Sequence, residues 1–474
     1  VVAAVICAMC AAWVPLLHYR LPVREAAAAD APNVVFVLVD ALRADRLSCA
    51  GYPRPTSPFI DRLAASGTMF ENAYSHGNRT IIAMPSVFTS QYPSYARAIE
   101  SGDWSTPLPD SQTTLAELFR EAGYTTMGLM SNPYLKRPFG LTQGFDRTEE
   151  FNNGRFHLSL YRALLATGLL PKPRFAGGIS ANAAEVTDAA VAWLGRAPAR
   201  SPFFCYVHYM DVHHPYLPPR VFEDMFNSRD WLSSIDPAGL FTKTVELVGK
   251  RQPYPLDDDE LTRLSDLYDA CIRYVDSEIA RVVNVAQGVN DRPTIVVVTS
   301  DHGDEFQEHG FLYHNNIVIE ELIRVPLVIW RSDRREAGRR VPELVRHVDL
   351  LPTLAEMAGF EAPAGVVGRS LSLLMDGGDD NLRASVAEGD HCSALIEPGW
   401  KLMRVDTTGT DTLFDLVADS RAKSDVGPIH VDRLEEMRRR LDAYVLGAPV
   451  SGTAARARVD AATLRQLQAL GYVN

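Results

Sequence analysis

The segment NVVFVLVD (residues 33–40) is a continuous run of apolar residues that ends in a carboxylate, Asp40. A strand that is apolar on both faces is typical of a parallel sheet covered by helices on both sides. Similar apolar runs recur at residues 124–130, 203–208, 294–300 and 325–330. Amphipathic helical patterns precede three of these runs, at residues 115–122, 183–194 and 264–283. This alternation predicts an α/β fold, with a large mixed, mostly parallel sheet sandwiched by helices.

The last quarter of the chain has a different pattern. Residues 400–405 and 412–416 have the pattern of two strands joined by a Thr/Gly turn, and a charged helix is expected over residues 433–446. These elements predict a smaller C-terminal antiparallel subdomain. We therefore divide the chain into a main domain, residues 33–375, and a C-terminal subdomain, residues 376–474.

The chain begins with an uncharged apolar segment, residues 1–17. This length is slightly below the roughly 20 residues that a membrane span needs. Because the chain starts with Val rather than Met, we expect a membrane segment that is truncated at its start, followed by a linker over residues 18–32. The core of an uncleaved signal peptide and a buried helix are the alternatives.

The composition is that of a globular protein. Hydrophobic residues make up 46% of the chain and charged residues 22%, which excludes a disordered protein. The net charge is −12 and no long basic run is present, so we expect no nucleic-acid partner. The six cysteines form no CxxC pair outside residues 1–17, which argues against a zinc ribbon or a thioredoxin-like site.

Carboxylates and imidazoles cluster where three of the predicted strands end. In an open α/β sheet, ligands bind at the carboxyl ends of the strands. Mixed oxygen and nitrogen donors are typical of sites for divalent metal ions, although a structural role is the alternative for each residue taken alone. The residues at these strand ends are Asp40; His208, Asp211, His213 and His214; and Asp301, His302, Asp304, His309 and His314.

A fourth polar segment is NRTIIAMPSVFTS (residues 78–90), in which hydroxyls precede a helical stretch. A helix N-terminus favours anions, so the hydroxyl of Thr80 is suited to bind a metal and to attack a phosphorus or sulfur centre. The alternative is that Thr80 only caps the helix.

Together these segments resemble the sulfatase family of the alkaline phosphatase superfamily, from about residue 33 to the C-terminus. The resemblance rests on residues 33–75 and on the motifs TSQYP (89–93), HYMDVHHPYLPP (208–219), TSDHGDEFQEHG (299–310), IEELIRVPLVIW (319–330), HVDLLPTLAEMAG (347–359), GRSL (368–371) and LQALGYVN (467–474). It implies an alkaline-phosphatase-like fold. It also implies a divalent metal ion (Ca, Mn, Mg or Zn) whose ligands are Asp40, Thr80, Asp301 and His302.

This sequence departs from the family's motif at the position of the nucleophile. Sulfatases usually carry a Cys or Ser there, in Cys/Ser-x-Pro/Ala-x-Arg, that is oxidised to formylglycine. The matching position is Thr80, and residues 80–84 read TIIAM. Oxidation of a Thr gives a ketone rather than an aldehyde, so no formylglycine is expected. The spacing of Thr80 and Pro85 resembles instead the phosphoethanolamine and phosphoglycerol transferases, which use a metal-bound Thr. The second Asp of the family's Asp-Asp pair is Ala41 here.

The resemblance implies a metal-dependent hydrolase of sulfuric or phosphoric esters that acts through Thr80 and a covalent intermediate. We expect His213, His309 or His314 to protonate the leaving oxygen or orient the ester, and Arg79 to bind it. A second metal site built from Asp211, His213 or His214 together with a further histidine is another option.

Two other functions stay open at this point. One is a membrane-anchored transferase of the phosphoethanolamine or phosphoglycerol type, acting on lipid or glycan, and the other is a catalytically inactive binding protein. The expected substrate is a small-molecule, glycan or lipid ester. The N-terminal segment and the resemblance together favour a membrane-anchored protein whose catalytic domain lies outside the cytoplasm, in the periplasm or at the cell surface.

Overall fold

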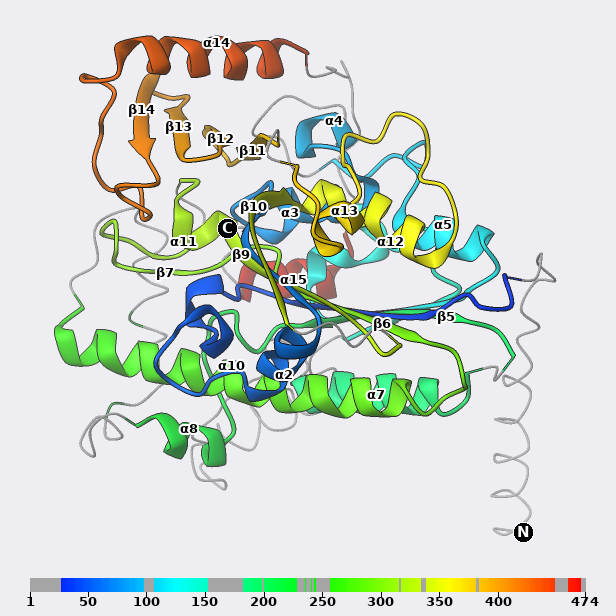
Figure 1. Cartoon of the computed structure of the whole chain (residues 1–474). Coiled ribbons are helices and arrows are strands. Elements are labelled where there is room, and N and C mark those ends of the chain that lie inside the picture. Colours follow the sequence, from blue (N-terminus) through cyan, green and yellow to red (C-terminus); the bar gives the residue numbers. More distant parts are fainter. Residues whose placement is uncertain are drawn as a thin grey trace, which may run out of the picture.

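The computed structural model describes residues 27–97, 106–151, 182–197, 200–227, 235, 240, 243, 256–314, 317–333, 338–380, 383–447 and 459–469. An eight-stranded sheet with the order β10-β2-β9-β6-β1-β5-β3-β4 forms its centre (Figure 1). All neighbouring strands are parallel except β9, which is antiparallel to both β2 and β6. The strands are β1 (Asn33–Val39), β2 (Thr68–Tyr74), β3 (Thr125–Met130), β4 (Arg147–Glu150), β5 (Phe203–Tyr209), β6 (Thr294–Thr299), β9 (Arg324–Arg331) and β10 (Arg339–Arg346). The predicted mixed, mostly parallel sheet is confirmed.

Helices cover both faces of this sheet (Figure 1). Odd-numbered residues of β1, such as Val35, pack into an apolar core shared with one helical layer, and even-numbered residues, such as Phe36, pack into a core shared with the other. The first layer consists of α2 (Pro58–Ser66), α7 (Ala183–Leu194) and α10 (Asp258–Ala286). The second consists of α3 (Thr80–Thr89), α5 (Leu115–Glu121), α12 (Leu350–Ala358) and α13 (Ser372–Met375). Burial on both faces explains why β1 is apolar throughout.

A second, antiparallel sheet follows in the last quarter of the chain, as predicted. Its order is β11-β12-β13-β14, and α14 packs against it. The elements are β11 (Ser385–Glu388), β12 (Cys392–Glu397), β13 (Trp400–Val405), β14 (Thr410–Asp415) and α14 (Val431–Gly447). The sequence analysis predicted β13, β14 and α14 but not β11 and β12. The boundary at residue 375 stays a prediction.

Short elements complete the chain. A two-stranded sheet of β7 (Glu305–Phe306) and β8 (Leu312–Tyr313) follows β6. The last described helix, α15 (Ala461–Ala469), returns to the main domain, where Leu467 packs with Ile81 and Tyr134. The remaining helices are α4 (Pro93–Arg97), α8 (Arg220–Phe226), α11 (Glu320–Ile323) and the 3₁₀ helices η2 (Ala44–Arg46), η3 (Ser48–Ala50), η4 (Pro133–Leu135), η5 (Arg137–Phe139) and η7 (His347–Asp349).

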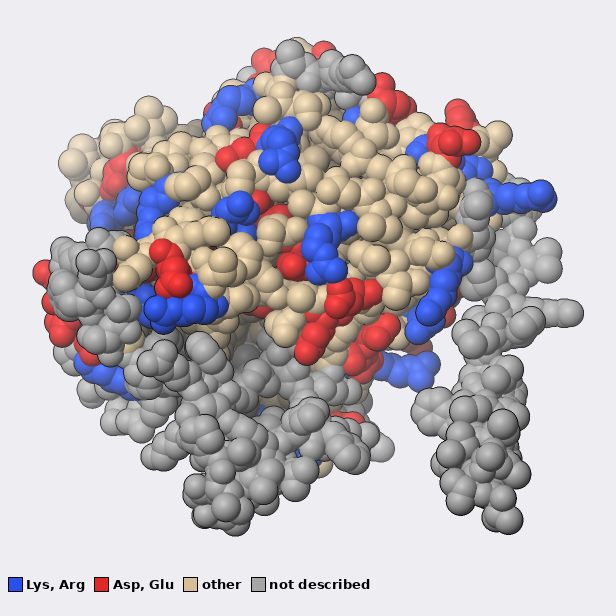
Figure 2. Space-filling view, turned by 90° about the horizontal axis from the view of Figure 1, so that it is seen from below, with Lys and Arg blue, Asp and Glu red and all other residues tan. Residues whose placement is uncertain are grey.

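The predicted membrane segment, residues 1–17, lies outside the described residues. Within the described ranges, no helix combines the length and the apolar character that crossing a bilayer requires. On the face seen from below, acidic and basic side chains are interspersed over the described residues (Figure 2).

Candidate active site

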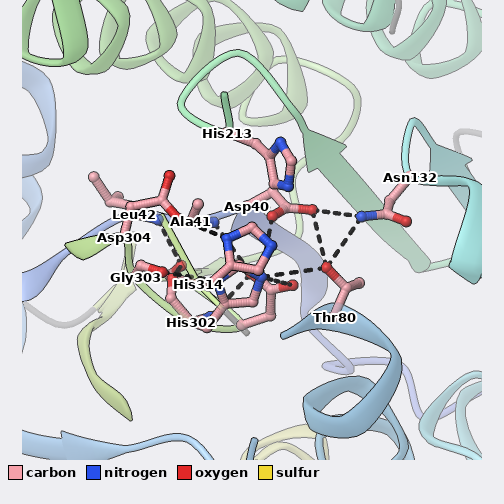
Figure 3. Close-up of polar contacts among 12 residues, drawn as sticks. Asp40, Ala41, Leu42, Thr80, Asn132, His213, His302, Gly303, Asp304 and His314 are labelled. Carbon is pink, nitrogen blue, oxygen red and sulfur yellow. Dashed lines mark hydrogen bonds and ion pairs between the residues drawn. The ribbon is translucent and has the colours of Figure 1, made fainter. Parts of the chain in front are cut away.

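The site lies at the edge of the sheet where the parallel strands β1, β5 and β6 end. β1 lies between β5 and β6, and Leu38 is in register with both His208 and Thr299. Asp40, which follows β1, is therefore brought next to the residues that follow β6 (Figure 3). This edge is where an open α/β sheet exposes the ends of its strands to a ligand.

The turn after β1 is bound tightly to the turn after β6. Ala41 has a φ of 60°, a left-handed conformation that is uncommon for a residue with a Cβ. Its backbone N–H donates to Asp301 Oδ1 at 3.3 Å, and the N–H of Leu42 donates to Ser300 Oγ at 2.9 Å. The residue that replaces the family's second carboxylate thus contributes a backbone donor that orients Asp301.

Gly303 is required by the close approach of another chain segment. A Cβ at this position would lie 2.1 Å from the carbonyl oxygen of Glu321, and the Gly303 N–H donates to the carbonyl of Leu322. The residues after β6 therefore lie directly against α11, which fixes the position of Asp301 and His302.

Three predicted metal ligands come together. Ligand atoms of Asp40, Asp301 and His302 all lie within 4.8 Å of one another, and all three side chains are fully buried. His302 Nδ1 lies 2.9 Å from the carbonyl of Gly303, so Nδ1 carries the proton and the lone pair of Nε2 faces the carboxylates. Nε2 is 3.4 Å from Asp40 Oδ1 and 3.6 Å from Asp301 Oδ2.

A divalent cation fits this donor set. Within the described part of the chain, neither Asp40 Oδ1 nor Asp301 Oδ2 accepts a hydrogen bond, although both atoms are buried. Burial, together with the charge of Asp301, raises the pKa of Asp40 well above its usual range. Two buried carboxylates and an imidazole lone pair that face one another are stabilised by a shared positive charge. The divalent metal that the sulfatase resemblance implies would supply this charge.

Thr80 lies at the same point. It is the first residue of α3, Arg79 holds the N-cap position, and no side chain caps this end of the helix. Thr80 Oγ donates to Asp40 Oδ2 at 3.3 Å and lies 3.4 Å from His302 Nε2. The alternative that Thr80 only caps the helix is therefore wrong, because its hydroxyl faces the carboxylates instead.

Asn132, which the sequence analysis missed, completes this group. Its Nδ2 donates to Asp40 Oδ2 at 2.7 Å and to Thr80 Oγ at 3.0 Å, while its Oδ1 accepts the N–H of Tyr134 at 2.9 Å. Figure 3 shows Asn132 and Asp40 on two sides of the Thr80 hydroxyl. The signal was present in the sequence, since Asn132 follows the apolar run 124–130 at a strand end.

His208 adds a further imidazole at the end of β5. Its Nδ1 donates to Ser131 Oγ at 2.9 Å, because the Ser131 hydroxyl itself donates to the His208 carbonyl at 2.6 Å. The other ring nitrogen, Nε2, lies 3.5 Å from Asp40 Oδ2. Burial lowers the pKa of His208 to about 4, so the ring is neutral at pH 7 and presents a lone pair to the site.

A histidine cluster adjoins these residues. Ligand atoms of His213, His214 and His314 lie within 4.8 Å of one another, and the rings of His302 and His314 are 4.3 Å apart. His314 Nδ1 lies 2.6 Å from Asp304 Oδ1. Burial lowers the pKa of His314 to about 4, so at pH 7 the ring donates Nδ1–H to Asp304 and keeps a lone pair on Nε2. The three imidazoles form a set that could hold a second metal ion.

Three residues that we expected at the site have other contacts. His309, in the turn between β7 and β8, has its Nε2 3.2 Å from Glu321 Oε2. Arg79 forms an ion pair with Asp390, in the turn between β11 and β12. Asp211 Oδ1 accepts the N–H of Ala183 at the start of α7, and Asp211 is not part of the histidine cluster. Each of these partners is distant in the sequence or belongs to another element.

Comparisons with known proteins identify the family of the chain. A family model described as Sulfatase matches residues 32–360. The uncharacterized sulfatase YidJ of Escherichia coli (strain K12) is 29% identical over 364 residues, which cover 72% of this chain and 70% of that protein.

Two solved structures show the same fold. The phosphonate monoester hydrolase of Agrobacterium radiobacter has a TM-score of 0.68 at 21% identity, covering 88% of this chain and 96% of that one. A protein solved with its substrate D-glucosamine-2-N,6-O-disulfate has a TM-score of 0.69 at 19% identity, covering 89% and 100%. The chain belongs to the sulfatase family, as an ester hydrolase of the sulfatase type with an alkaline-phosphatase-like fold.

Proposed function

We propose that this protein hydrolyses sulfuric or phosphoric esters with Thr80 as the nucleophile. The observation that carries the proposal is the position of the Thr80 hydroxyl, which contacts Asp40, His302 and Asn132 at once. A hydroxyl that only stabilised the fold would not need a buried carboxylate, an imidazole and an amide around it. A nucleophile requires such neighbours, because a Thr hydroxyl is unreactive until its proton is removed and its oxygen is held in place.

Asp40, Thr80, Asp301 and His302 are the residues that would hold the divalent metal. When bound, such an ion lowers the pKa of a coordinated hydroxyl and neutralises charge on a non-bridging ester oxygen. The donor set mixes carboxylates with imidazole, which suits Zn or Mn better than Ca or Mg.

The chain's own residues supply the proton transfers. Thr80 Oγ attacks the phosphorus or sulfur, forming a new ester bond, while its proton passes to Asp40 Oδ2, the acceptor 3.3 Å away. The bond between the central atom and the alcohol oxygen breaks. The alcohol leaves as its oxyanion, because His314 directs its one proton toward Asp304 and has only a lone pair on Nε2. Asn132 holds the Thr80 oxygen in line for the attack.

Water resolves the intermediate. Thr80 carries one oxygen on Cβ, so the covalent ester on it has no second hydroxyl that could expel the sulfate or phosphate by elimination. Water must attack the phosphorus or sulfur itself, giving one proton to the Nε2 lone pair of His314, from which it passes on to neutralise the released oxyanion, and Thr80 recovers its proton from Asp40. The hydrolases among the related proteins support water rather than an alcohol as the acceptor.

Trapping of the intermediate tests this function. Metal-loaded protein is incubated separately with aryl sulfate, aryl phosphate and aryl phosphonate esters, and intact-mass measurement with peptide mapping locates any adduct. We expect an adduct on Thr80, a loss of at least about 10⁴-fold in kcat/KM in Thr80→Ala, and activity within about tenfold of the wild type in Thr80→Ser, which keeps the hydroxyl. Turnover by Thr80→Ala at the wild-type rate would contradict the proposal.

A further inference from the structure

The segment that leads to Thr80 is held by the C-terminal sheet. Gly77 forms a bridge with Glu388, and the Glu388 N–H donates to the carbonyl of His76 at 2.9 Å. The Glu388 carboxylate accepts the Ser94 hydroxyl at 3.0 Å and the Tyr444 hydroxyl at 2.5 Å. The turn between β11 and β12, residues 389–391, is therefore anchored beside residues 76–79 by the contacts of Glu388, which directly precedes it.

This turn carries the partner of Arg79. Arg79 immediately precedes Thr80, and its Nη2 forms an ion pair with Asp390 Oδ1. The two side chains are 14% and 20% exposed, so the pair is partly shielded but open to solvent on one side. Arg79 Nε is buried and has no hydrogen-bond partner among the described residues.

Tyr134 locates the pair relative to the site. Burial raises the pKa of the Tyr134 hydroxyl to about 12; the charge of Arg79 lowers this pKa and the charge of Asp390 raises it. Tyr134 lies two residues after Asn132, whose amide contacts Thr80. The Arg79–Asp390 pair therefore lies within electrostatic reach of Tyr134, two residues from the amide that contacts Thr80.

We propose that Asp390 is a positioning residue that sets the ester charge this site accepts, by pairing with Arg79. The proposal deepens the proposed function and rests on it. An unpaired arginine beside the nucleophile would add one positive charge and favour esters with two negative charges. The pair adds no net charge, so the site favours esters with a single negative charge: sulfate monoesters, phosphodiesters and phosphonate monoesters.

Two aryl esters with the same leaving group test the inference. At about pH 8, 4-nitrophenyl phosphate carries two negative charges and 4-nitrophenyl phenylphosphonate carries one. The kcat/KM ratio of the first ester to the second is measured for the wild type, Asp390→Asn, Arg79→Gln and the double variant, all in the full-length, metal-loaded protein.

We expect Asp390→Asn to raise this ratio about tenfold and Arg79→Gln to lower it about tenfold, as fits one partly exposed unit charge near another. The double variant, which again adds no net charge, should return to within about threefold of the wild type. A purely structural role would lower both rates together and leave the ratio unchanged, and that result in Asp390→Asn would overturn the inference.

A binding measurement separates this inference from the proposed function. If no variant turns over any ester, the proposed function fails. Inorganic phosphate binding, measured by calorimetry on the same four metal-loaded proteins, then decides the inference alone. Asp390→Asn should bind phosphate about tenfold more tightly than the wild type. Equal affinities in all four proteins would overturn it.

Discussion

Replacement of Asn132 by Ala tests how Thr80 is held in place. Asn132 Nδ2 donates to the Asp40 carboxylate at 2.7 Å and to Thr80 Oγ at 3.0 Å. A hydrogen bond to a buried charge contributes about 2 kcal/mol and a neutral one about 1 kcal/mol. If both act fully in the transition state, their loss of about 3 kcal/mol lowers kcat/KM about 100-fold.

The assay is steady-state hydrolysis of an aryl ester by metal-loaded protein, together with chemical unfolding of each variant. Asn132→Asp is a sharper probe, because it keeps an acceptor for the Tyr134 N–H but loses the donor. It also places a second carboxylate beside Asp40. We expect Asn132→Asp to lower kcat/KM more than Asn132→Ala does.

Asn290 offers a matched control. Asn33 Nδ2 donates to Asn290 Oδ1 at 2.8 Å, at the end of β1 opposite to Asp40. Asn290→Ala should lose about 1 kcal/mol of stability and keep kcat/KM within about twofold. If Asn132→Ala also stayed within about threefold of the wild type while Thr80→Ala was inactive, Asn132 would have no role in orienting the nucleophile.

Four further outcomes are expected. Removal of divalent metal by a chelator should abolish ester hydrolysis and lower the melting temperature, with both restored by Zn or Mn, because two buried carboxylates lose their shared counter-charge. His309→Ala should keep kcat/KM within about twofold in the same ester assay, since His309 pairs with Glu321 and not with the nucleophile. Lys401→Met should cost about 3 kcal/mol in urea unfolding, because Lys401 Nζ forms a buried ion pair with Glu320 at 2.9 Å; the double variant with Glu320→Gln should recover part of this loss. Burial raises the pKa of Asp211 to about 7. The carboxyl therefore contributes full stability below pH 4 and loses it as the pH rises through 7, so the free energy of unfolding of Asp211→Asn should exceed that of the wild type by roughly 4 kcal/mol at pH 8 and match it near pH 4.

The sequence alone predicted the centre of the sheet better than its edge. β1, β5 and β6 are buried on both faces, so their apolar runs are unbroken. The sequence analysis missed β2 and β10, the two strands at the edge of the sheet beyond β9. Polar residues interrupt both strands, and their register shifts between Phe70 and Ala73 and between Val341 and Leu344. A strand with a register shift does not have the regular pattern by which strands are predicted.

Some residues of the candidate site could be predicted from the sequence and others could not. Asp40, Asp301 and His302 could be expected to meet, because they follow neighbouring parallel strands. The partner of Arg79 could not be predicted, because Asp390 lies 311 residues further along the chain. The sequence analysis overlooked Asn132, because an Asn directly before a proline is typical of an ordinary turn. The membrane segment and the location outside the cytoplasm stay predictions, as the described residues do not include residues 1–17.

The docking of the C-terminal sheet has a consequence for biosynthesis. His76, four residues ahead of the nucleophile, bonds through Nδ1 to the carbonyl of Val386, 310 residues later in translation. The backbone carbonyl of His76 accepts a hydrogen bond from the Glu388 N–H. Until β11 has emerged from the ribosome, these groups of the nascent chain lack their partners. The loop that presents Thr80 therefore reaches its final conformation only near the end of synthesis, once the last quarter of the chain has folded against it.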